Sequence, residues 1–191
     1  MRKIGIFPGS FNPVHIGHLA IANYIKEYSD LDEIWMLVSP HNPLKDKRDL
    51  ASPVERVSML RIALNESYGI KVSDFELSLP TPTYTIHTLR ALQQAYKDCD
   101  FTLIIGGDNW VTFHKWFQYE TIINEFRIFI YPRPNQNIEI KSCNVFIFEA
   151  PLLDISSTML RESLQQNIEL RYFFPAGVYQ YIMENQLYTK D

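Results

Sequence analysis

Two histidines three residues apart, His15 and His18, end a stretch whose residue types suit phosphate binding, Gly9 to His18. The stretch directly follows the strand-like run 3–7 and directly precedes the helical pattern 19–28. A turn of small residues between a strand and a helix exposes backbone N–H groups, and the first helical turn adds unpaired donors and the positive end of the helix dipole. Both imidazoles are expected on the same side of the helix. The stretch therefore predicts a site for a polyphosphate.

A metal site or a merely structural helix start would use the same two histidines. A His-x-x-His pair can bind zinc, but the other histidines and the two cysteines offer no evident third ligand, and no His-Glu-x-x-His motif occurs. The dinucleotide fingerprint Gly-x-Gly-x-x-Gly is also absent, which argues against a hydride-transferring dehydrogenase. We therefore favour phosphate binding and expect no metal ligands from the protein.

A second set of candidate phosphate ligands lies near the other end of the chain, from Ile155 to Arg161. Three hydroxyl side chains open a predicted helix there, and the arginine follows one turn later. Taken alone, the stretch is more typical of an ordinary serine N-cap with a surface arginine.

A lysine behind the second predicted strand could also reach a phosphate. The segment 39–45 contains two prolines, which stiffen the loop, and ends at Lys45. From composition alone a solvated lysine is favoured, because Lys47 and Arg48 follow in the same polar run.

Two further segments combine groups that could hold a ribose and an aromatic ring. Gly106 and Gly107 leave the fourth predicted strand and allow close approach of the backbone to a ligand, while Asp108 can accept from ribose hydroxyls. Trp116 follows, although a tryptophan in such a segment is more often part of the core. The other segment runs from Thr83 to Leu89.

The predicted elements would bring these segments to one edge of a sheet. Strand-like runs alternate with helical patterns, which predicts an α/β fold with a doubly wound parallel sheet. In such open sheets the ligand lies outside the carboxyl ends of the strands, where these segments fall. A capping box with Pro53 at the first helical position marks the start of the second helix. The expected strands are 4–7, 33–38, 70–73, 101–105, 127–131 and 145–148. The expected helices are 19–28, 54–65, 84–97, 117–124, 157–166 and 175–186.

Length, charge and composition limit the classes of protein to which this chain can belong. The 191 residues, 46% of them hydrophobic, suffice for one domain spanning 1–191 and are too few for two ordinary ones. The net charge of −4 argues against a non-specific nucleic-acid binder, which needs a basic face. No apolar run reaches the roughly 18 residues that cross a bilayer. Two isolated cysteines and a start without signal-peptide features fit a reducing cytoplasm. We expect a cytoplasmic protein without nucleic-acid or membrane partners, and leave a homo-oligomer open.

The two candidate phosphate sites resemble the two signatures of the nucleotidyltransferase superfamily. The stretch 9–18 matches every fixed letter of its Gly-x-Phe-x-Pro-x-His-x-Gly-His string, and 155–161 matches Ile-Ser-Ser-Thr-x-x-Arg. Asn12 stands where relatives often carry Asp, and since Asn keeps the turn-forming carbonyl, we expect the turn to survive. The resemblance implies a Rossmann-like nucleotidyltransferase fold.

The other segments resemble those of nicotinate mononucleotide adenylyltransferases. Residues 40–45 are similar to their Asn-Pro-x-Lys loop, and 106–116 match Gly-x-Asp-x-x-x-x-Phe-x-x-Trp, whose tryptophan stacks on the pyridine ring. Residues 84–89 are similar to Tyr-Thr-x-Asp-Thr-Leu at the pyridine pocket, with His87 in place of Asp. The resemblance implies transfer of AMP from ATP to nicotinate mononucleotide, in NAD synthesis, with Mg²⁺ held mainly by ATP phosphates.

The resemblance also implies roles for single residues. The catalytic set is His15, His18, Lys45 and Arg161. The ATP-binding set is Gly9, Ser10, Phe11, His15, His18, Gly106, Asp108, Ile155, Ser156, Ser157, Thr158 and Arg161. The acceptor-binding set is Lys45, Tyr84, Thr85, Trp116 and Phe117. The alternatives are a sibling enzyme with another phosphate acceptor, such as phosphopantetheine, and a regulatory domain that binds nucleotide without turnover.

Overall fold

A parallel β-sheet is the centre of the computed structural model, which describes residues 1–40, 50–65, 69–132, 138–140, 142–151 and 153–189. The described residues form a six-stranded sheet in the order β3-β2-β1-β4-β5-β6, and every neighbouring pair is parallel. The strands are β1 (Arg2–Gly9), β2 (Glu33–Val38), β3 (Ile70–Ser73), β4 (Cys99–Gly106), β5 (Arg127–Tyr131) and β6 (Val145–Ile147). This order reverses direction at β1 and β4, which is the doubly wound topology. The predicted fold class is confirmed.

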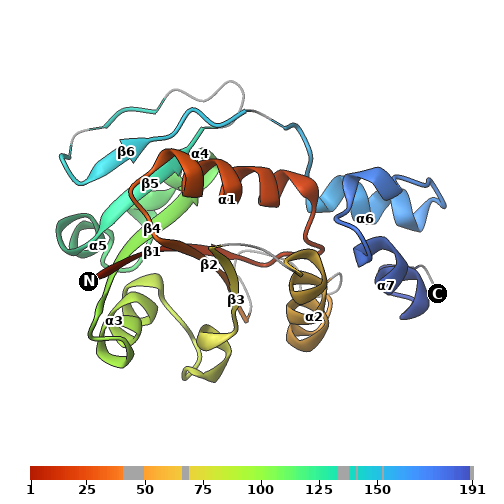
Figure 1. Ribbon diagram of the computed structural model, residues 1–191, viewed down its shortest axis with the longest axis horizontal. Coiled ribbons are helices and arrows are strands. Elements are labelled where there is room, and N and C mark those ends of the chain that lie inside the picture. Colours follow the sequence, from red (N-terminus) through yellow and green to blue (C-terminus); the bar gives the residue numbers. More distant parts are fainter. Residues whose placement is uncertain (41–49, 66–68, 133–137, 141, 152, 190–191) are drawn as a thin grey trace.

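Helices cover both faces of the sheet, as Figure 1 shows for α1 (Ile16–Tyr28) and α3 (Thr85–Ala95). The side of α1 also holds α2 (Pro53–Ala63), and the side of α3 holds α5 (Tyr119–Glu125). The alternation along β2 explains the two layers, because Met36 packs under α1 and α2 whereas Leu37 packs under α3. The inner strand β2 is therefore apolar on both faces, as buried parallel strands are.

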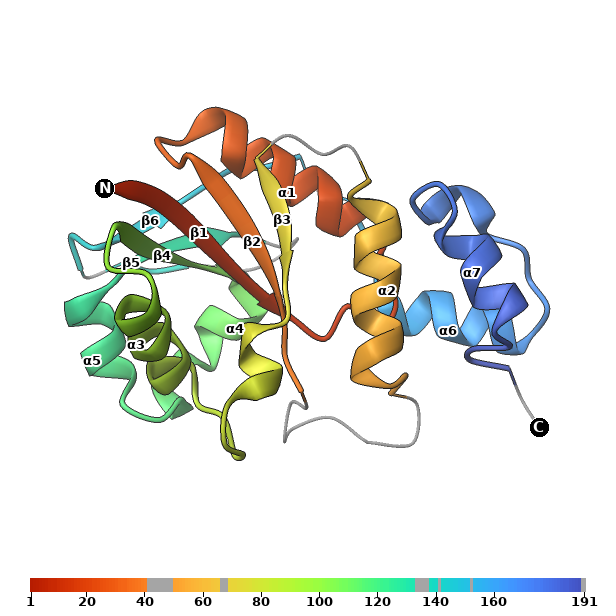
Figure 2. The ribbon, with the colours of Figure 1, turned by 60° about the horizontal axis from the view of Figure 1, so that its bottom comes forward.

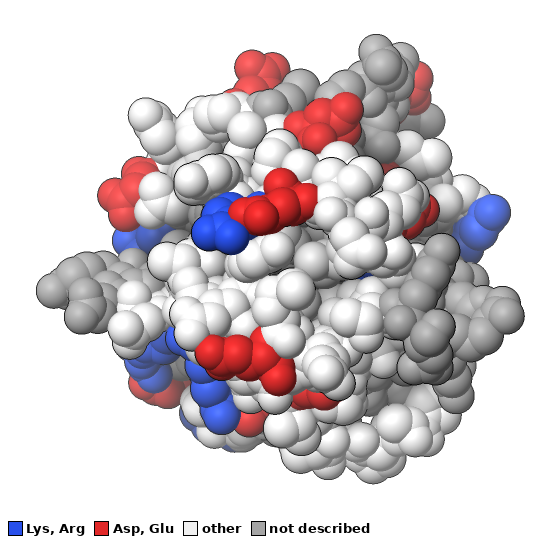
Figure 3. All heavy atoms as spheres, turned by 90° about the vertical axis from the view of Figure 1, so that its right-hand side faces the viewer, with Lys and Arg blue, Asp and Glu red and all other residues white. Residues whose placement is uncertain are grey.

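The last helices, α6 (Ser157–Gln165) and α7 (Val178–Glu184), lie beside α2 at the end of the sheet (Figure 2). Their apolar side chains Leu160, Val178 and Ile182 are buried in the same core layer as α1 and α2. Figure 3 shows this end of the molecule with scattered acidic and basic side chains and no continuous patch of one sign among the described residues. This packing brings the C-terminal part of the chain close to the turn that follows β1.

Several predicted helix limits needed correction. The start of α2 is as expected, with Ser52 accepting from the N–H of Glu55 and the Glu55 carboxylate accepting from the N–H of Ser52. By contrast α5 begins at Tyr119, because Gln118 adopts a left-handed φ of 53°, and α7 begins after Gly177 with φ of 80°. A left-handed residue cannot continue an α-helix, so the predicted starts of these two helices lie too close to the N-terminus of the chain.

Short helical segments were not predicted at all. The helix α4 (Gly107–Val111) follows β4 without a loop, and single 3₁₀ turns occur at Phe75–Ser78, Phe113–Lys115 and Arg171–Phe173. A single turn is too short to show a hydrophobic period in the sequence. None of the helices in the described part of the chain is long and apolar enough to span a membrane.

Candidate active site

The turn after β1 is built around a buried phenylalanine. Phe11 has a φ of 45° and is 1% exposed. Its ring centroid lies 5.9 Å from that of Phe7 and 5.1 Å from that of His18. A Cβ on Gly9 would lie 2.7 Å from the Phe11 ring, so no side chain fits there. The Phe11 side chain belongs to the core, so only the backbone of this residue is available to a nucleotide. The Phe11 ring packs edge-on against the ring of His18.

The two histidines of the turn stack at the start of α1. His15 is buried at the N-cap, and its ring centroid lies 3.7 Å from that of the half-buried His18, with 30° between the planes. Nδ1 of His18 accepts the backbone N–H of His15 at 3.2 Å. A neutral imidazole with an acceptor Nδ1 carries its proton on Nε2. His18 is thus oriented as an Nε2–H donor at the N-terminus of a 13-residue helix.

A small cavity opens beside these histidines at the carboxyl ends of β1 and β5. Its lining residues are His15, Gly17, His18, Ile21, Tyr131, Pro132, Ala150, Pro151, Leu153, Asp154 and Ile155. Most of the lining residues are apolar and His15, His18 and Asp154 are polar, a combination that suits a flat ring attached to a charged group. The resemblance pointed to Ile155 here, whereas Tyr131, Ala150 and Asp154 were missed. The rule that ligands lie at strand ends would have suggested Tyr131, the last residue of β5.

The two predicted phosphate sites are in direct contact. The hydroxyl of Ser157 donates to the carbonyl of Pro13 at 2.9 Å, and Nη1 of Arg161 donates to the carbonyl of Asn12 at 2.8 Å. Ser156 caps α6 by accepting the N–H of Met159 at 3.1 Å. The N-terminus of α6 is therefore held against the turn that precedes α1. Within the described residues, Nε and Nη2 of Arg161 make no hydrogen bond, which leaves these two donors for phosphate oxygens.

A buried arginine on α2, which the sequence analysis did not single out, donates hydrogen bonds to the turn after β1. Arg56 is fully buried, and its guanidinium donates to the carbonyls of Ser10 and Ser39, each at 2.8 Å. It also donates to the carbonyls of Ala51 at 3.1 Å and Pro40 at 3.0 Å. Burial lowers the pKa of Arg56, and the carbonyl dipoles take the place of a carboxylate partner. An arginine beside Met59 and Leu60 on a core-facing helix was the available signal.

The end of β4 has no room for a side chain at Gly106. A Cβ on Gly106 would collide with Asp108 and would lie 3.0 Å from the hydroxyl oxygen of Tyr131. Asp108 itself is exposed in the first turn of α4. Its carboxylate therefore lies at the carboxyl end of the strand next to β1, where the ribose role predicted for it requires it to be.

The predicted acceptor residues form an exposed aromatic group at the start of α3. Tyr84 and Phe117 are 41% and 45% exposed, and their ring centroids lie 4.7 Å apart at 35°. His87 lies edge-on to both, at 5.7 Å from Tyr84 and 5.5 Å from Phe117. Thr85 is the first residue of α3, so its N–H has no partner within the helix. We call Tyr84, His87 and Phe117 the aromatic triad.

Trp116 lies between the core and this surface. Its ring centroid is 5.0 Å from that of the buried Phe113, and the side chain is half-buried. It therefore anchors the segment in the layer under α3 while one part of it remains accessible.

Comparison with known proteins identifies the family. The cytidylyltransferase-like family model matches residues 6–163, which include both turns described above. The chain belongs to the cytidylyltransferase-like family. A Bacteroides fragilis relative named probable nicotinate-nucleotide adenylyltransferase is 46% identical over 95% of this chain and 92% of its own. A Flavobacterium johnsoniae relative of the same name is 43% identical over 98% of this chain and all of its own.

Solved structures show the same fold. The nicotinic acid mononucleotide adenylyltransferase of Plasmodium falciparum, complexed with NaAD, has a TM-score of 0.84 with 98% of each chain covered and 21% identity. A Vibrio parahaemolyticus protein described as a nicotinate-nucleotide adenylyltransferase has a TM-score of 0.73. The predicted nucleotidyltransferase fold and the resemblance to nicotinate mononucleotide adenylyltransferases are both confirmed.

In this cytidylyltransferase-like protein, one predicted catalytic residue is not placed. Lys45 lies in the segment 41–49, outside the described residues. The described flanks are held firmly, since Arg56 binds the carbonyls of Ser39 and Pro40 on one side and Ala51 on the other. The roles of Lys45 and of the other site residues stay predictions.

Proposed function

We propose that this protein transfers AMP from ATP to nicotinate mononucleotide, forming nicotinate adenine dinucleotide and pyrophosphate in NAD synthesis. The observation that carries the proposal is the contact between the two signature turns, through Ser157 with Pro13 and Arg161 with Asn12. The contact joins the N-terminus of α6 and Arg161 to the turn that precedes α1, which supports a polyphosphate site formed by both helix N-termini, His18 and Arg161. The names of relatives more than 40% identical over nearly the whole chain support the same reaction.

The chemistry needs positioning more than proton transfer. The phosphate of the acceptor is already an anionic nucleophile near neutral pH, so no general base is required. The phosphate attacks the α-phosphorus of ATP, the bond to the β-phosphate oxygen breaks, and pyrophosphate leaves. His18 donates to the charge that develops at the α-phosphate, with His15 behind it, and Arg161 and Lys45 meet the departing pyrophosphate. The backbone of Gly9 and Ser10, and the N-terminus of α6 from Ser156 to Thr158, surround the same charge.

The adenosine half of ATP occupies the cavity beside α1. The purine lies against Gly17, Tyr131 and Ile155, and Asp108 accepts from the ribose hydroxyls at the end of β4. An exposed carboxylate suits this role, because it presents two acceptor atoms.

The acceptor occupies the region between Trp116 and the start of α3. The pyridine ring stacks on an aromatic face offered by Trp116 and the aromatic triad, and the nicotinate carboxylate accepts backbone N–H groups near Thr85 and Phe117. A carboxamide cannot satisfy these donors with its NH₂ end, so this arrangement selects the acid.

Three remaining parts of the proposal concern the whole protein. Mg²⁺ is carried mainly on ATP phosphate oxygens, as the resemblance implies. Residues 1–191 act as one domain, supported by the continuous sheet and by the packing of α6 and α7 on α2. We propose a cytoplasmic location, which the two isolated cysteines support, and the state of association stays a prediction.

The test is pyrophosphate release from ATP with each acceptor in turn. We expect rapid release with nicotinate mononucleotide, slower release with nicotinamide mononucleotide, and none with phosphopantetheine. Release only with phosphopantetheine would favour the sibling reaction, and nucleotide binding without release for any acceptor would favour the regulatory alternative.

A further inference from the structure

The last residues of the chain reach the first signature turn. The hydroxyl of Tyr188 donates to Oδ1 of Asn12 at 2.7 Å, across 176 positions of sequence. The side chain of Asn12 is 5% exposed, so this contact is part of the interior of the protein. No predicted site residue lies beyond Arg161, and the reaction described above does not use Tyr188.

Asn12 is where four segments of the chain converge. Its Oδ1 also accepts the N–H of Ala51 at 3.0 Å, immediately before α2. Its backbone carbonyl accepts Nη1 of Arg161 from α6, at 2.8 Å. The first turn, the entry to α2, the helix α6 and the C-terminal segment are therefore linked through one side chain and its own carbonyl.

Tyr188 is suited to act as a permanent donor at this point. The positive charges of Arg161 and Arg56 act on its hydroxyl and favour ionisation, but burial outweighs them and raises the pKa of Tyr188. The hydroxyl therefore stays protonated throughout the neutral range and keeps donating to Asn12. Because the charge of Arg161 acts on it, the Tyr188 hydroxyl lies close to the arginine that is expected to bind phosphate.

We propose that Tyr188 is a positioning residue for ATP, whose hydroxyl holds Asn12 and thereby sets the turn 9–13 and Arg161 in register for the phosphates. The proposal rests on the proposed AMP transfer. Without the hydroxyl, Oδ1 of Asn12 loses one of the two donors described above and keeps the N–H of Ala51, and the carbonyl that orients Arg161 is less restrained. The effect reaches ATP, because the turn and Arg161 belong to the nucleotide side, and spares the acceptor, whose predicted residues lie around α3.

The test compares Tyr188→Phe with Tyr181→Phe in the full-length protein. Phenylalanine retains the packed ring and removes one hydroxyl. The hydroxyl of Tyr181, in the same C-terminal segment, makes no hydrogen bond to the described residues, so Tyr181→Phe is the matched control. We expect kcat/KM for ATP to fall about 5- to 10-fold in Tyr188→Phe, as for the loss of one buried hydrogen bond. The KM for nicotinate mononucleotide should change less than about twofold, within the scatter of uncoupled sites.

A double-mutant cycle with Asn12→Ala identifies the route of the effect. If Tyr188 acts through Asn12, adding Tyr188→Phe to Asn12→Ala causes no further loss for ATP, and adding it to Asn12→Asp, which keeps the acceptor oxygen, causes the full loss. Equal losses for ATP and the acceptor, or Tyr188→Phe values equal to those of Tyr181→Phe, would overturn the positioning role. Calorimetric titration with ATP alone repeats the comparison without turnover. A wild type that binds ATP but does not adenylylate nicotinate mononucleotide would contradict the proposed function and leave this comparison of ATP affinities intact.

Discussion

The nucleotide side and the acceptor side of the candidate site are built in different ways. On the nucleotide side residues 11–13 of the turn are buried, and the turn is hydrogen-bonded by α2, α6 and the C-terminal segment. On the acceptor side the aromatic triad is exposed, and its rings contact one another at the surface. Phosphoryl transfer depends on positioning, so the part that holds ATP requires rigid support from several elements. In the proposed reaction, recognition of the acceptor rests on a few surface side chains, which could change without disturbing that support.

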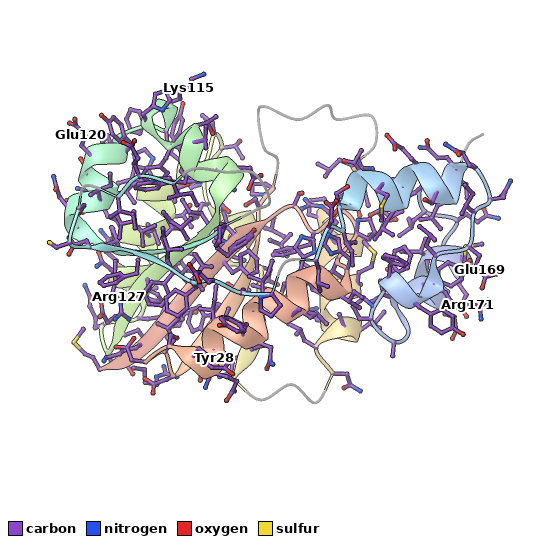
Figure 4. The ribbon with its side chains drawn as sticks, turned by 90° about the horizontal axis from the view of Figure 1, so that it is seen from above. Tyr28, Lys115, Glu120, Arg127, Glu169 and Arg171 are labelled. Carbon is purple, nitrogen blue, oxygen red and sulfur yellow. The ribbon has the colours of Figure 1, made fainter. Side chains whose placement is uncertain are left out.

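Outside both regions, the charged side chains lie at the periphery. Figure 4 shows Arg127 at one end of the molecule and Glu169 with Arg171 at the other, where α6 and α7 lie. Arg127 pairs with Asp30 at 3.0 Å, and Arg171 pairs with Glu169. These ion pairs provide a reference against which changes in the two functional regions can be measured.

The largest effect is expected for His18→Ala on the nucleotide side. Removal of one preorganised donor to developing charge should lower kcat about 10²- to 10³-fold, with a much smaller change in ATP affinity. Steady-state kinetics together with ATP titration measures both quantities. Near-normal turnover in a folded variant would remove His18 from the mechanism.

Arg161→Lys should be the next most damaging change. A lysine can make the single bond to the carbonyl of Asn12 or meet a phosphate, but it lacks the planar fork that does both. We expect a loss of about 10- to 100-fold in kcat/KM for ATP, as for a charge-assisted hydrogen bond. The loss in binding should be larger for ATP than for AMP, and equal losses would show that Arg161 does not meet the outer phosphates.

Trp116→Ala tests whether the acceptor side is independent. Stacking does not depend on the ring substituent, so the variant should weaken both nicotinate and nicotinamide mononucleotides by about 1 to 3 kcal/mol. Their ratio of kcat/KM should stay nearly constant, and ATP binding should not change. A collapse of the ratio would mean that Trp116 itself selects the acid, and a loss of ATP affinity would show that the two sides are not separate.

The smallest effect is expected for the ion pair between Asp30 and Arg127. The hydrogen bonds from Arg127, then those from Lys3, lower the pKa of Asp30 from 3.8 to about 2. Because the folded-state pKa is depressed, the ionised pair stabilises the protein above about pH 4, and this contribution is lost as the pH falls through about 2. Asp30 is nearly half exposed, so solvent screening limits the contribution to about 0.5 kcal/mol. Asp30→Asn should lower stability against urea by that amount at pH 7 and by progressively less as the pH falls from about 4 toward 2, with unchanged kinetics.

Local patterns were enough to predict most of the sheet and its order of elements. All six predicted strands agree with the observed ones to within two residues at each end. Long apolar runs bounded by polar residues are reliable because parallel strands are buried on both faces. The capping box at Ser52 was equally clear, since both of its bonds lie within one helical turn. The shifted starts of α5 and α7 depended on single left-handed residues, for which the helical period carries no signal.

The sequence by itself determined the two signature turns and their chemistry, because their residue types and spacing are local and the phosphate groups they suit are generic. Only the tertiary structure decided how the turns are held together. Arg56, Tyr131 and Tyr188 are ordinary residues in the sequence, and their importance follows from partners that lie far away along the chain. Burial makes each polar group find a partner, and which partner it finds depends on the packing of the whole molecule.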